Sequence, residues 1–265
     1  MLDKFNREIN YLRISLTDKC NLRCIYCMPE EGMQLKQHKD IMRYEQIIRI
    51  VQEAAGLGIH KIRLTGGEPL IKKDIDLLIG RLSAIKEIKE LCLTTNGVLL
   101  AEKAKILKQA GLNSINISLD TLQPEKYKEI TRGGDVADVL RGIDQALHEG
   151  FKIKVNMVVI KDKNEDELDD MKIFCHNKNI KLQLINHFNL SNKKNDEYLF
   201  DRPPKCKQCN RIRLLSDGTL KPCLHSDTEY KINYDNIRES LEKAILSKPE
   251  NGSSCTDRKM FEIGG

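Results

Sequence analysis

Three cysteines in the segment CNLRCIYC have a spacing that suits a metal cluster with one free position. They are Cys20, Cys24 and Cys27. A structural zinc site usually takes four ligands in two short-spaced pairs, and the next histidine, His38, is eleven residues beyond Cys27. Iron–sulfur clusters are held by thiolates on close spacings. Three thiolates on a four-iron cluster leave one iron open to a non-protein ligand, so we predict such a cluster in preference to zinc.

A second set of cysteines, Cys206, Cys209 and Cys223, again counts three. Its spacing defines the metal less well, because His225 follows two residues after Cys223 and could complete a zinc site. Cys255 could instead supply a fourth thiolate to a cluster. Spacing alone therefore leaves a closed zinc site, a closed cluster and a cluster with an open iron as alternatives.

The elements that must position these cysteines alternate along the first 190 residues. Short segments rich in β-branched residues predict six strands, which are YLRISL, HKIRLT, ELCLTT, NSINISL, KIKVNMVVI and IKLQLI. Helix-period segments lie between them, at 43–56, 73–85, 99–110, 137–149 and 164–177. This order indicates βαβ units and an α/β fold, whose parallel strands form either a partial barrel or an open sheet.

The remaining residues have a different character. The polar segment NLSNKKNDEY and the sequence RPPK indicate a linker over 187–205. The second cysteine set follows, then a helical stretch at 236–247 and a polar tail that ends in two glycines. We therefore predict two parts, a barrel or sheet over 1–190 and a small cluster-binding region with the tail over 191–265.

Small, polar or metal-binding residues follow four consecutive predicted strands. The first strand leads into the first cysteine set, the second into TGGEP (65–69), the third into TTNG (94–97) and the fourth into SLD (118–120). The loops after the strands of a parallel sheet build its active site. We therefore expect one site at this rim of the sheet.

Composition restricts the classes of function. The sequence has 265 residues, of which 40% are hydrophobic and 31% charged, and its net charge is +5. This mild excess with mixed signs suits an anionic small molecule better than a nucleic acid. No apolar run approaches the length of a membrane span, and MLDKFNREIN lacks the apolar region of a secretory signal. Nine cysteines without an export signal predict reduced thiols and a cytoplasmic protein.

The motifs CNLRCIYC and TGGEPL, each after a predicted strand, resemble the radical S-adenosylmethionine superfamily. The resemblance implies a partial (β/α)6 TIM-like barrel and a [4Fe–4S] cluster on Cys20, Cys24 and Cys27, whose open iron binds S-adenosylmethionine. Glycines let backbone approach a ligand closely, and a carboxylate suits the ammonium group of this cofactor. The implied contacts with S-adenosylmethionine are Tyr26, Gly66, Gly67, Glu68, Ser118 and Phe188, the last in place of a common methionine.

The segment KCKQCNRIRLLSDGTLKPCL and the final IGG are similar to the GTP 3′,8-cyclase family within that superfamily. This resemblance implies a second [4Fe–4S] cluster on Cys206, Cys209 and Cys223, whose open iron takes the guanine base. It places the GTP contacts at Arg13, Arg63, Thr94, Lys154, Arg211 and Arg213, and the catalytic residues at Arg211, Arg213, Gly264 and Gly265. Alternate arginines on an extended strand point the same way.

The resemblance predicts a lyase that removes the 3′ hydrogen of GTP and joins that ribose carbon to C8 of guanine, in molybdenum cofactor biosynthesis. It implies a one-electron donor of flavodoxin or ferredoxin type and a downstream cyclic pyranopterin synthase; a homodimer is one option, and no nucleic acid or membrane is expected. Gln183 in place of an arginine and a short stretch before the second cysteines depart from the family. They leave open another nucleotide or a peptide as substrate, and a zinc-binding α/β module is the non-enzymatic alternative.

Overall fold

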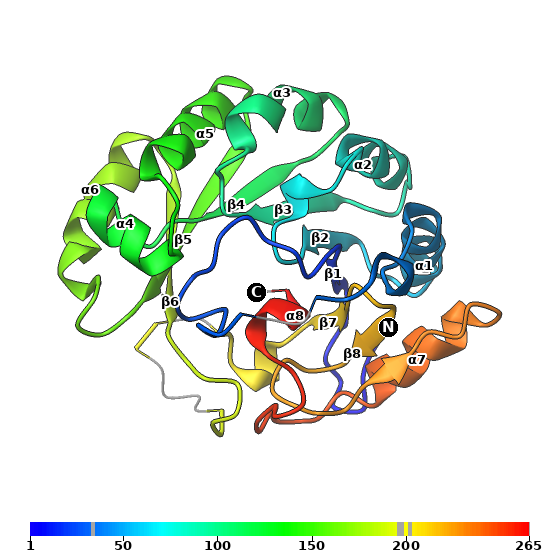
Figure 1. Cartoon of the computed structure of the whole chain (residues 1–265). Helices are drawn as coiled ribbons and strands as arrows, with labels where there is room; N and C mark the ends of the chain where they lie inside the picture. The colour runs from blue at the N-terminus through cyan, green and yellow to red at the C-terminus, as the bar shows by residue number, and fades with distance from the viewer. Residues whose placement is uncertain (33–34, 195–198, 201–202, 265) are drawn as a thin grey trace.

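A single sheet organises the part of the chain that the structure, a computed structural model, describes, namely residues 1–32, 35–194, 199–200 and 203–264. Its strands are β1 Tyr11–Ser15, β2 Lys61–Thr65, β3 Glu90–Thr95, β4 Ser114–Ser118, β5 Lys152–Val159, β6 Lys181–Asn186, β7 Arg211–Leu214, β8 Thr219–Lys221 and β9 Tyr230–Lys231. In these described ranges the nine strands run in the order β6-β5-β4-β3-β2-β1-β7-β8-β9 (Figure 1). The strands β1 to β7 are parallel, each to its neighbour.

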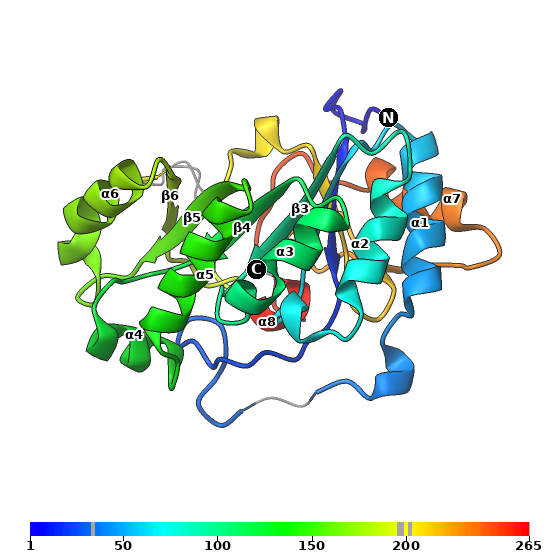
Figure 2. The same cartoon turned by 90° about the horizontal axis from the view of Figure 1, so that it is seen from above.

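Helices connect the parallel strands and lie on the outer side of the curved sheet (Figure 1 and Figure 2). They are α1 Tyr44–Gly56, α2 Ile75–Ser83, α3 Leu100–Gln109, α4 Pro124–Thr131, α5 Val136–His148 and α6 Leu168–Asn177. In α5 the buried residues Val139, Ile143 and Ala146 recur at helical spacing, so one stripe faces the sheet. The side chain of Asp135 caps this helix by accepting a hydrogen bond from Ala137 N at 2.8 Å.

Each strand separates an apolar outer face from a polar inner face, as β1 shows. Leu12 and Ile14 are fully buried and pack in the core that the helices share. Tyr11 and Arg13 alternate with them and line a cavity on the other side. Burial of an aliphatic side chain contributes about 1.5–3 kcal/mol. The outer face therefore stabilises the strand, and the inner face can carry side chains for chemistry.

The chain returns to the sheet after residue 190. The strand β7 pairs with β1 on the side away from β2, so β1 has a partner on each side. The strands β8 and β9 follow in antiparallel pairing, and α7 Ile237–Leu246 packs against α1. The short helices are η1 His38–Asp40, η2 Pro69–Ile71, η3 Glu165–Glu167, η4 Cys206–Gln208 and α8 Met260–Ile263.

The six predicted strands and the predicted helices of the first part are confirmed, with bounds that differ by a few residues. The prediction omitted α4, and it did not foresee that three further strands would extend the same sheet. The strands β7 to β9 are only two to four residues long, so their sequences carry little periodic signal. Among the described residues, no helix combines the length and apolar composition that crossing a lipid bilayer requires.

The burial of β7 against the core gives a test of its place in the sheet. Ile212 on β7 is 0% exposed, and we expect Ile212→Ala to lower the free energy of unfolding by about 2–5 kcal/mol because it leaves a cavity. Guanidinium denaturation of the anaerobic, cofactor-free protein measures this change. Ile106→Ala, at a position on α3 that is 46% exposed, is the control and should change stability by less than about 0.5 kcal/mol. Equal losses in both variants would contradict the assigned place of β7.

Candidate active site

A cavity of about 320 Å³ lies against the inner face of the sheet. Distant parts of the sequence line it together, among them all six residues predicted to contact GTP, three predicted to contact S-adenosylmethionine and the second cysteine set. These are Arg13, Arg63, Thr94, Lys154, Arg211 and Arg213, then Tyr26, Ser118 and Phe188, and then Cys206, Cys209 and Cys223. Tyr26 of the first cysteine loop belongs to the lining, whereas the other predicted residues of that loop and of the TGGEP turn do not, namely Cys20, Cys24, Cys27, Gly66, Gly67 and Glu68. The fold thus assembles most of the predicted site at one place.

A row of three arginines crosses the inner face of β2, β1 and β7. Arg63, Arg13 and Arg213 occupy matching positions in the strand register, where neighbouring strands lie about 4.8 Å apart. Burial, with repulsion from neighbouring arginines, lowers the pKa of Arg13 to about 10 and lowers that of Arg213 well below its usual value. Because guanidinium groups keep their proton at neutral pH, the row repels itself and favours an anion bound beside it.

A second row, two residues earlier in each strand, holds Lys61, Tyr11 and Arg211. Tyr11 Oη accepts a hydrogen bond from Arg63 Nε at 2.6 Å. Burial raises the pKa of Tyr11, but the charges of Arg13, Arg63 and Arg211 outweigh burial and bring this pKa down to about 8. Lys61 and Tyr11 line the cavity and were not predicted as site residues. Lys61 lies two residues before Arg63 on β2, and Tyr11 lies two residues before Arg13 on β1. This spacing places each pair on the same face of its strand and could have predicted both residues.

Polar side chains of β4, β5 and β6 form another wall of the cavity. Lys154 Nζ donates a hydrogen bond to Gln183 Oε1 at 3.3 Å, and Asn116 Nδ2 donates to Asn156 Oδ1 at 3.4 Å. All four side chains line the cavity. Gln183, which departs from the family pattern, therefore faces the same cavity as the predicted site residues that match this pattern. Of these four side chains, three are neutral amides and Lys154 carries a positive charge.

The turn after β2 holds the start of the first cysteine loop. Gly67 N donates to Thr17 O at 2.7 Å and Glu68 N donates to Lys19 O at 2.8 Å. A Cβ atom on Gly67 would lie 2.1 Å from Lys19 O, and one on Gly66 would lie 2.7 Å from Thr17 O. Both positions therefore require glycine. The backbone pairing of β1 with β2 therefore continues as far as Lys19, the residue before Cys20. The hydrogen bond from Glu68 N to Lys19 O fixes the start of the first cysteine loop.

The carboxylate of Glu68 connects the TGGEP turn to the TTNG turn. Its Oε1 accepts hydrogen bonds from Leu70 N at 2.9 Å and Thr95 Oγ1 at 2.7 Å, and its Oε2 accepts one from Asn96 N at 2.7 Å. Burial raises the pKa of Glu68 to about 7, against the pull of these hydrogen bonds. Asn96 Nδ2 in turn lies 3.8 Å from Cys20 Sγ. The carboxylate of Glu68 therefore links the two turns by hydrogen bonds, next to Cys20.

The other end of the first cysteine loop is anchored to the strand ends. Tyr26 Oη donates to Asp120 Oδ2 at 2.7 Å, and Asp120 Oδ1 accepts from Val158 N at 2.8 Å. The three thiols of the loop are half-buried, and burial raises the pKa of Cys27 to about 12. Such thiols stay protonated on their own, whereas coordination to a metal deprotonates them. Three closely spaced thiols that need a metal to ionise fit a [4Fe–4S] cluster.

The second cysteine set lies beside a buried lysine. Lys248 is 2% exposed, and its Nζ donates to the carbonyl oxygens of Arg211 and Pro222 at 2.8 and 2.9 Å. Burial raises the pKa of Cys209, but the charges of Lys248 and Arg211 outweigh burial and lower this pKa. A cationic environment favours the thiolate, which is the metal-binding form of cysteine. The donor chemistry of this set therefore also fits a cluster.

The two residues that could close the second set lie in different surroundings. Cys255 is 0% exposed and belongs to a separate apolar cluster with Leu190, Leu215 and Ile263. His225 lines the cavity, and burial lowers the pKa of its imidazole to about 4. In the described part of the chain, no three His, Cys, Asp or Glu side chains converge as ligands of one metal ion. A four-iron cluster is larger than one ion, so its thiolates stand further apart.

The tail enters the inner side of the sheet, where α8 lies beside β1 and β7 (Figure 1). Gly264 O accepts hydrogen bonds from Arg13 Nη2 and Arg213 Nη1, both at 3.3 Å. Gly264 has a φ of +75°, and a Cβ atom there would lie 2.5 Å from Thr65 Oγ1. This position therefore requires glycine, and the tail backbone reaches the arginine row. Gly265, also predicted to be catalytic, lies outside the described residues.

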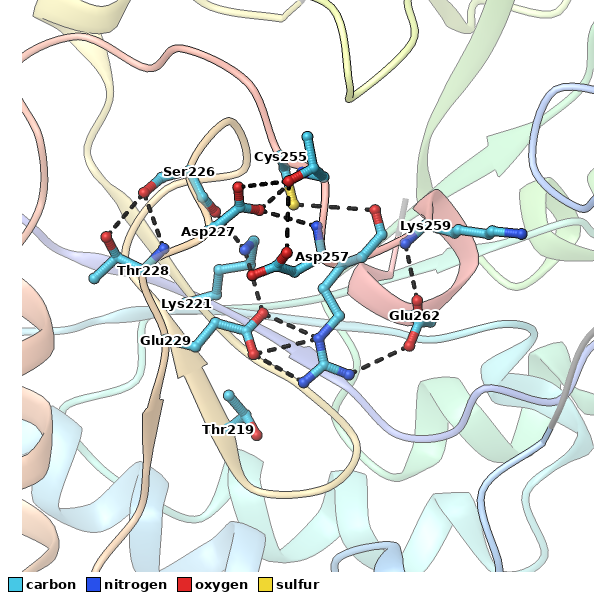
Figure 3. Close-up of polar contacts among 12 residues, drawn as sticks. Thr219, Lys221, Ser226, Asp227, Thr228, Glu229, Cys255, Asp257, Lys259 and Glu262 are labelled. Atoms are coloured by element: carbon cyan, nitrogen blue, oxygen red, sulfur yellow. Dashed lines mark hydrogen bonds and ion pairs between the residues drawn. The ribbon is translucent and has the colours of Figure 1, made fainter.

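A network of ion pairs fixes the segment before this glycine to the β8–β9 hairpin (Figure 3). Arg258 donates to the carboxylate of Glu229 from Nε at 3.1 Å and from Nη2 at 2.8 Å, and to Glu262 Oε1 at 3.3 Å. Lys221, which is 0% exposed, donates to Glu229 Oε1 at 3.2 Å. Asp227 accepts from two backbone N–H groups of the same segment. This network was not predicted, because Lys221 lies in a segment recognised for its cysteines and arginines, and Glu229 and Arg258 lie outside the recognised motifs.

Comparison with known proteins agrees with this geometry. The pattern of the Radical SAM superfamily matches residues 14–175. The GTP 3′,8-cyclase of Clostridium botulinum (strain Hall) is 40% identical over 319 aligned residues, and that of Alkaliphilus oremlandii is 41% identical over 320, in both cases with 100% of each chain covered. The chain belongs to the GTP 3′,8-cyclase family of the radical SAM superfamily. It is therefore an enzyme with S-adenosylmethionine and a [4Fe–4S] cluster as cofactors.

Solved structures confirm the predicted partial barrel. Streptococcus suis SuiB bound to S-adenosylmethionine has a TM-score of 0.70 at 19% identity, with 92% of this chain and 67% of SuiB covered. The structure of anSMEcpe with bound AdoMet has a TM-score of 0.67 at 17% identity, with 91% of this chain and 81% of anSMEcpe covered. The cyclase alignments are longer than the 265 residues of this chain, so they contain positions that this chain lacks.

The close approach of Gly67 to Lys19 predicts the effect of adding a single methyl group. Gly67→Ala should displace the first cysteine loop, because the new Cβ would lie 2.1 Å from a backbone oxygen. We expect a loss of stability of about 1–3 kcal/mol and less iron and sulfide bound per chain after anaerobic reconstitution. Gly80→Ala on α2 is the matched control, since a Cβ there meets nothing within 4 Å. Wild-type iron content in Gly67→Ala would refute the positioning role of this contact.

The ion-pair network predicts how firmly the tail is held. Arg258→Gln removes charge-assisted hydrogen bonds worth about 1.5–3 kcal/mol each, so amide hydrogen exchange in residues 255–264 should become at least about tenfold faster. Mass spectrometry of peptides from this segment measures the exchange. Arg238→Gln is the matched control, because the pair of Arg238 with Glu242 is exposed on one helix and contributes little. Unchanged exchange in Arg258→Gln would show that the tail is anchored by other contacts.

Proposed function

We propose that this protein is a GTP 3′,8-cyclase, a radical lyase that removes the hydrogen atom at C3′ of GTP and joins C3′ to C8 of guanine. This reaction is the first step of molybdenum cofactor biosynthesis. The observation that carries the proposal is that the row of three arginines, the further cations Lys61, Arg211 and Lys154, and the second cysteine set line one cavity. The relatives of this chain at about 40% identity bear that name.

The triphosphate of GTP suits the arginine rows. Arg13, Arg63 and Arg213 present planar guanidinium groups side by side, and each can meet phosphate oxygens in pairs. Arg211 and Lys154 add charge within the same cavity. Bound phosphate would relieve the mutual repulsion of these cations. The hydroxyl of Thr94, which accepts a hydrogen bond from Arg63 Nη1 at 3.4 Å, completes the proposed contacts with GTP.

The first cysteine set would hold the cluster that activates S-adenosylmethionine. When bound and reduced by an outside donor of flavodoxin or ferredoxin type, this cluster supplies the electron that cleaves the cofactor to methionine and a 5′-deoxyadenosyl radical. Cys20, Cys24 and Cys27 would be its ligands, which leaves one iron for the cofactor. The chain's role is to place the cofactor next to the nucleotide and to exclude water. The proposed contacts with S-adenosylmethionine are Tyr26, Gly66, Gly67, Glu68, Ser118 and Phe188.

The second cysteine set would hold a [4Fe–4S] cluster whose open iron takes the guanine base. Its three thiols line the cavity, while Cys255 packs in a separate apolar cluster. Residues 1–190 would then form the radical barrel, and residues 191–265 the linker, the second cluster region and the tail. Gly264 and Gly265 would act beside Arg211 and Arg213 in the reaction, and the hydrogen bonds from Arg13 and Arg213 to Gly264 O support this role.

The setting of the enzyme follows from this chemistry. The product would pass to a cyclic pyranopterin synthase, and a homodimer is an option for assembly. We place the reaction in the cytoplasm, because all nine cysteines are free thiols and thiols stay reduced in that compartment.

An anaerobic assay tests the proposal. Reconstituted protein with S-adenosylmethionine, reductant and GTP should form 5′-deoxyadenosine and consume GTP in equal amounts. Arg213→Gln should raise the dissociation constant of GTP about 10- to 100-fold, because it removes charge-assisted contacts with phosphate. Arg141→Gln, at a side chain that is 65% exposed, is the control and should bind GTP normally. The cyclase proposal would be refuted if 5′-deoxyadenosine formed at the same rate with and without GTP and no GTP were consumed. The radical cleavage of S-adenosylmethionine would still stand in that case.

A further inference from the structure

His225 is a buried polar residue of the cavity whose hydrogen-bonding capacity is unused within the chain. The residue is 3% exposed and lines the cavity. Within the described residues, neither its Nδ1 nor its Nε2 has a hydrogen-bond partner. A buried polar group without a partner costs free energy, and native proteins satisfy nearly all such groups with protein, water or ligand. The imidazole is therefore suited to contact a molecule that binds in the cavity.

The surroundings of His225 fix the direction of its ring. The aromatic ring of Phe188 lies 5.2 Å from the imidazole, centre to centre, at an angle of 42°. On the backbone side, His225 O accepts a hydrogen bond from Ser253 N at 2.8 Å. The turn at Gly252 packs so closely that a Cβ there would lie 2.9 Å from His225 Cβ and 3.2 Å from Cys223 Sγ. The imidazole thus stands in a defined place beside the second cysteine set.

We propose that His225 hydrogen-bonds the purine base of the nucleotide at the second cysteine set and helps to select that base. The inference rests on the proposed function, because it takes a purine nucleoside triphosphate as the ligand. A neutral imidazole has one N–H donor and one acceptor nitrogen, which match the alternating donors and acceptors at the edge of a purine. Phosphate offers only acceptors, and the arginine rows on β1, β2 and β7 supply its donors better.

Two substitutions separate the hydrogen bond from the packing of the ring. His225→Phe keeps an aromatic ring against Phe188 but removes both nitrogen atoms, whereas His225→Gln keeps a donor and an acceptor. His176→Phe is the control, since His176 lies on the exposed side of α6. Each variant is reconstituted anaerobically, and the dissociation constants of GTP, ITP and ATP are measured by equilibrium dialysis. Iron and sulfide per chain and the electron paramagnetic resonance spectrum of the reduced, nucleotide-free protein are measured in parallel.

We expect His225→Phe to raise the dissociation constant of GTP about tenfold, which corresponds to about 1.4 kcal/mol, and to reduce the preference for GTP over ATP. His225→Gln should recover most of both. Iron content and the nucleotide-free spectrum should match the wild type in all variants.

Three results would overturn the inference, the last of them together with the proposed function. Wild-type affinity and selectivity in His225→Phe would show that the imidazole does not touch the base. A loss of iron, or an altered nucleotide-free spectrum, would make His225 a ligand of the cluster instead. If the wild-type protein binds GTP without consuming it, the proposed cyclase function fails and the inference about His225 stands, because binding is measured apart from turnover. A wild type that binds none of the three nucleotides overturns the inference and the proposed function together.

Discussion

The strand register that aligns Arg63, Arg13 and Arg213 is the constraint on which the rest of the site depends. Like charges at neighbouring positions of a sheet destabilise it, and here burial adds the cost of desolvation. The fold tolerates the row because the opposite face of the same strands is apolar, with Leu12 and Ile14 fully buried under the helices. Stability thus comes from one face of the sheet, and the other face carries a repulsion that a bound anion relieves.

The tail belongs to the same electrostatic arrangement. Gly264 O accepts hydrogen bonds from two arginines of the row, so a carbonyl dipole partly offsets their charge. A phosphate oxygen carries more negative charge than a carbonyl and is the stronger acceptor for the same N–H groups. Under the proposed function, a bound anion would compete with Gly264 O for these N–H groups, and the position of the last residues would be coupled to its presence. The pairing of Arg258 with Glu229 anchors the segment before them, which confines this coupling to the end of the chain.

Local patterns were enough to predict β1 to β6, the helices between them except α4, and the rim where the motifs meet, because each depends on residues close in sequence. The pairing of β7 with β1 could not be predicted, since the four residues Arg211–Leu214 carry no information about a partner 200 residues away. Tyr11 and Lys61 could have been predicted, because each alternates with an arginine on its own strand, but their alignment with Arg211 depends on this register. The burial of Cys255 with Leu190 was equally hidden, because cysteine spacing is the same for a ligand and for a core thiol.

Affinity and selectivity in this cavity have different physical origins. Under the proposed function, the arginine row would attract any nucleoside triphosphate, since it would meet phosphate groups that all such molecules share. Under the proposed function, selection of the base would come from neutral groups, namely the amides of Gln183, Asn116 and Asn156 and the imidazole of His225. Sites of this kind discriminate strongly, because a base with the wrong pattern leaves buried donors or acceptors unpaired. Gln183 belongs to these neutral groups, so under the proposed function it would contribute matched hydrogen bonds rather than charge.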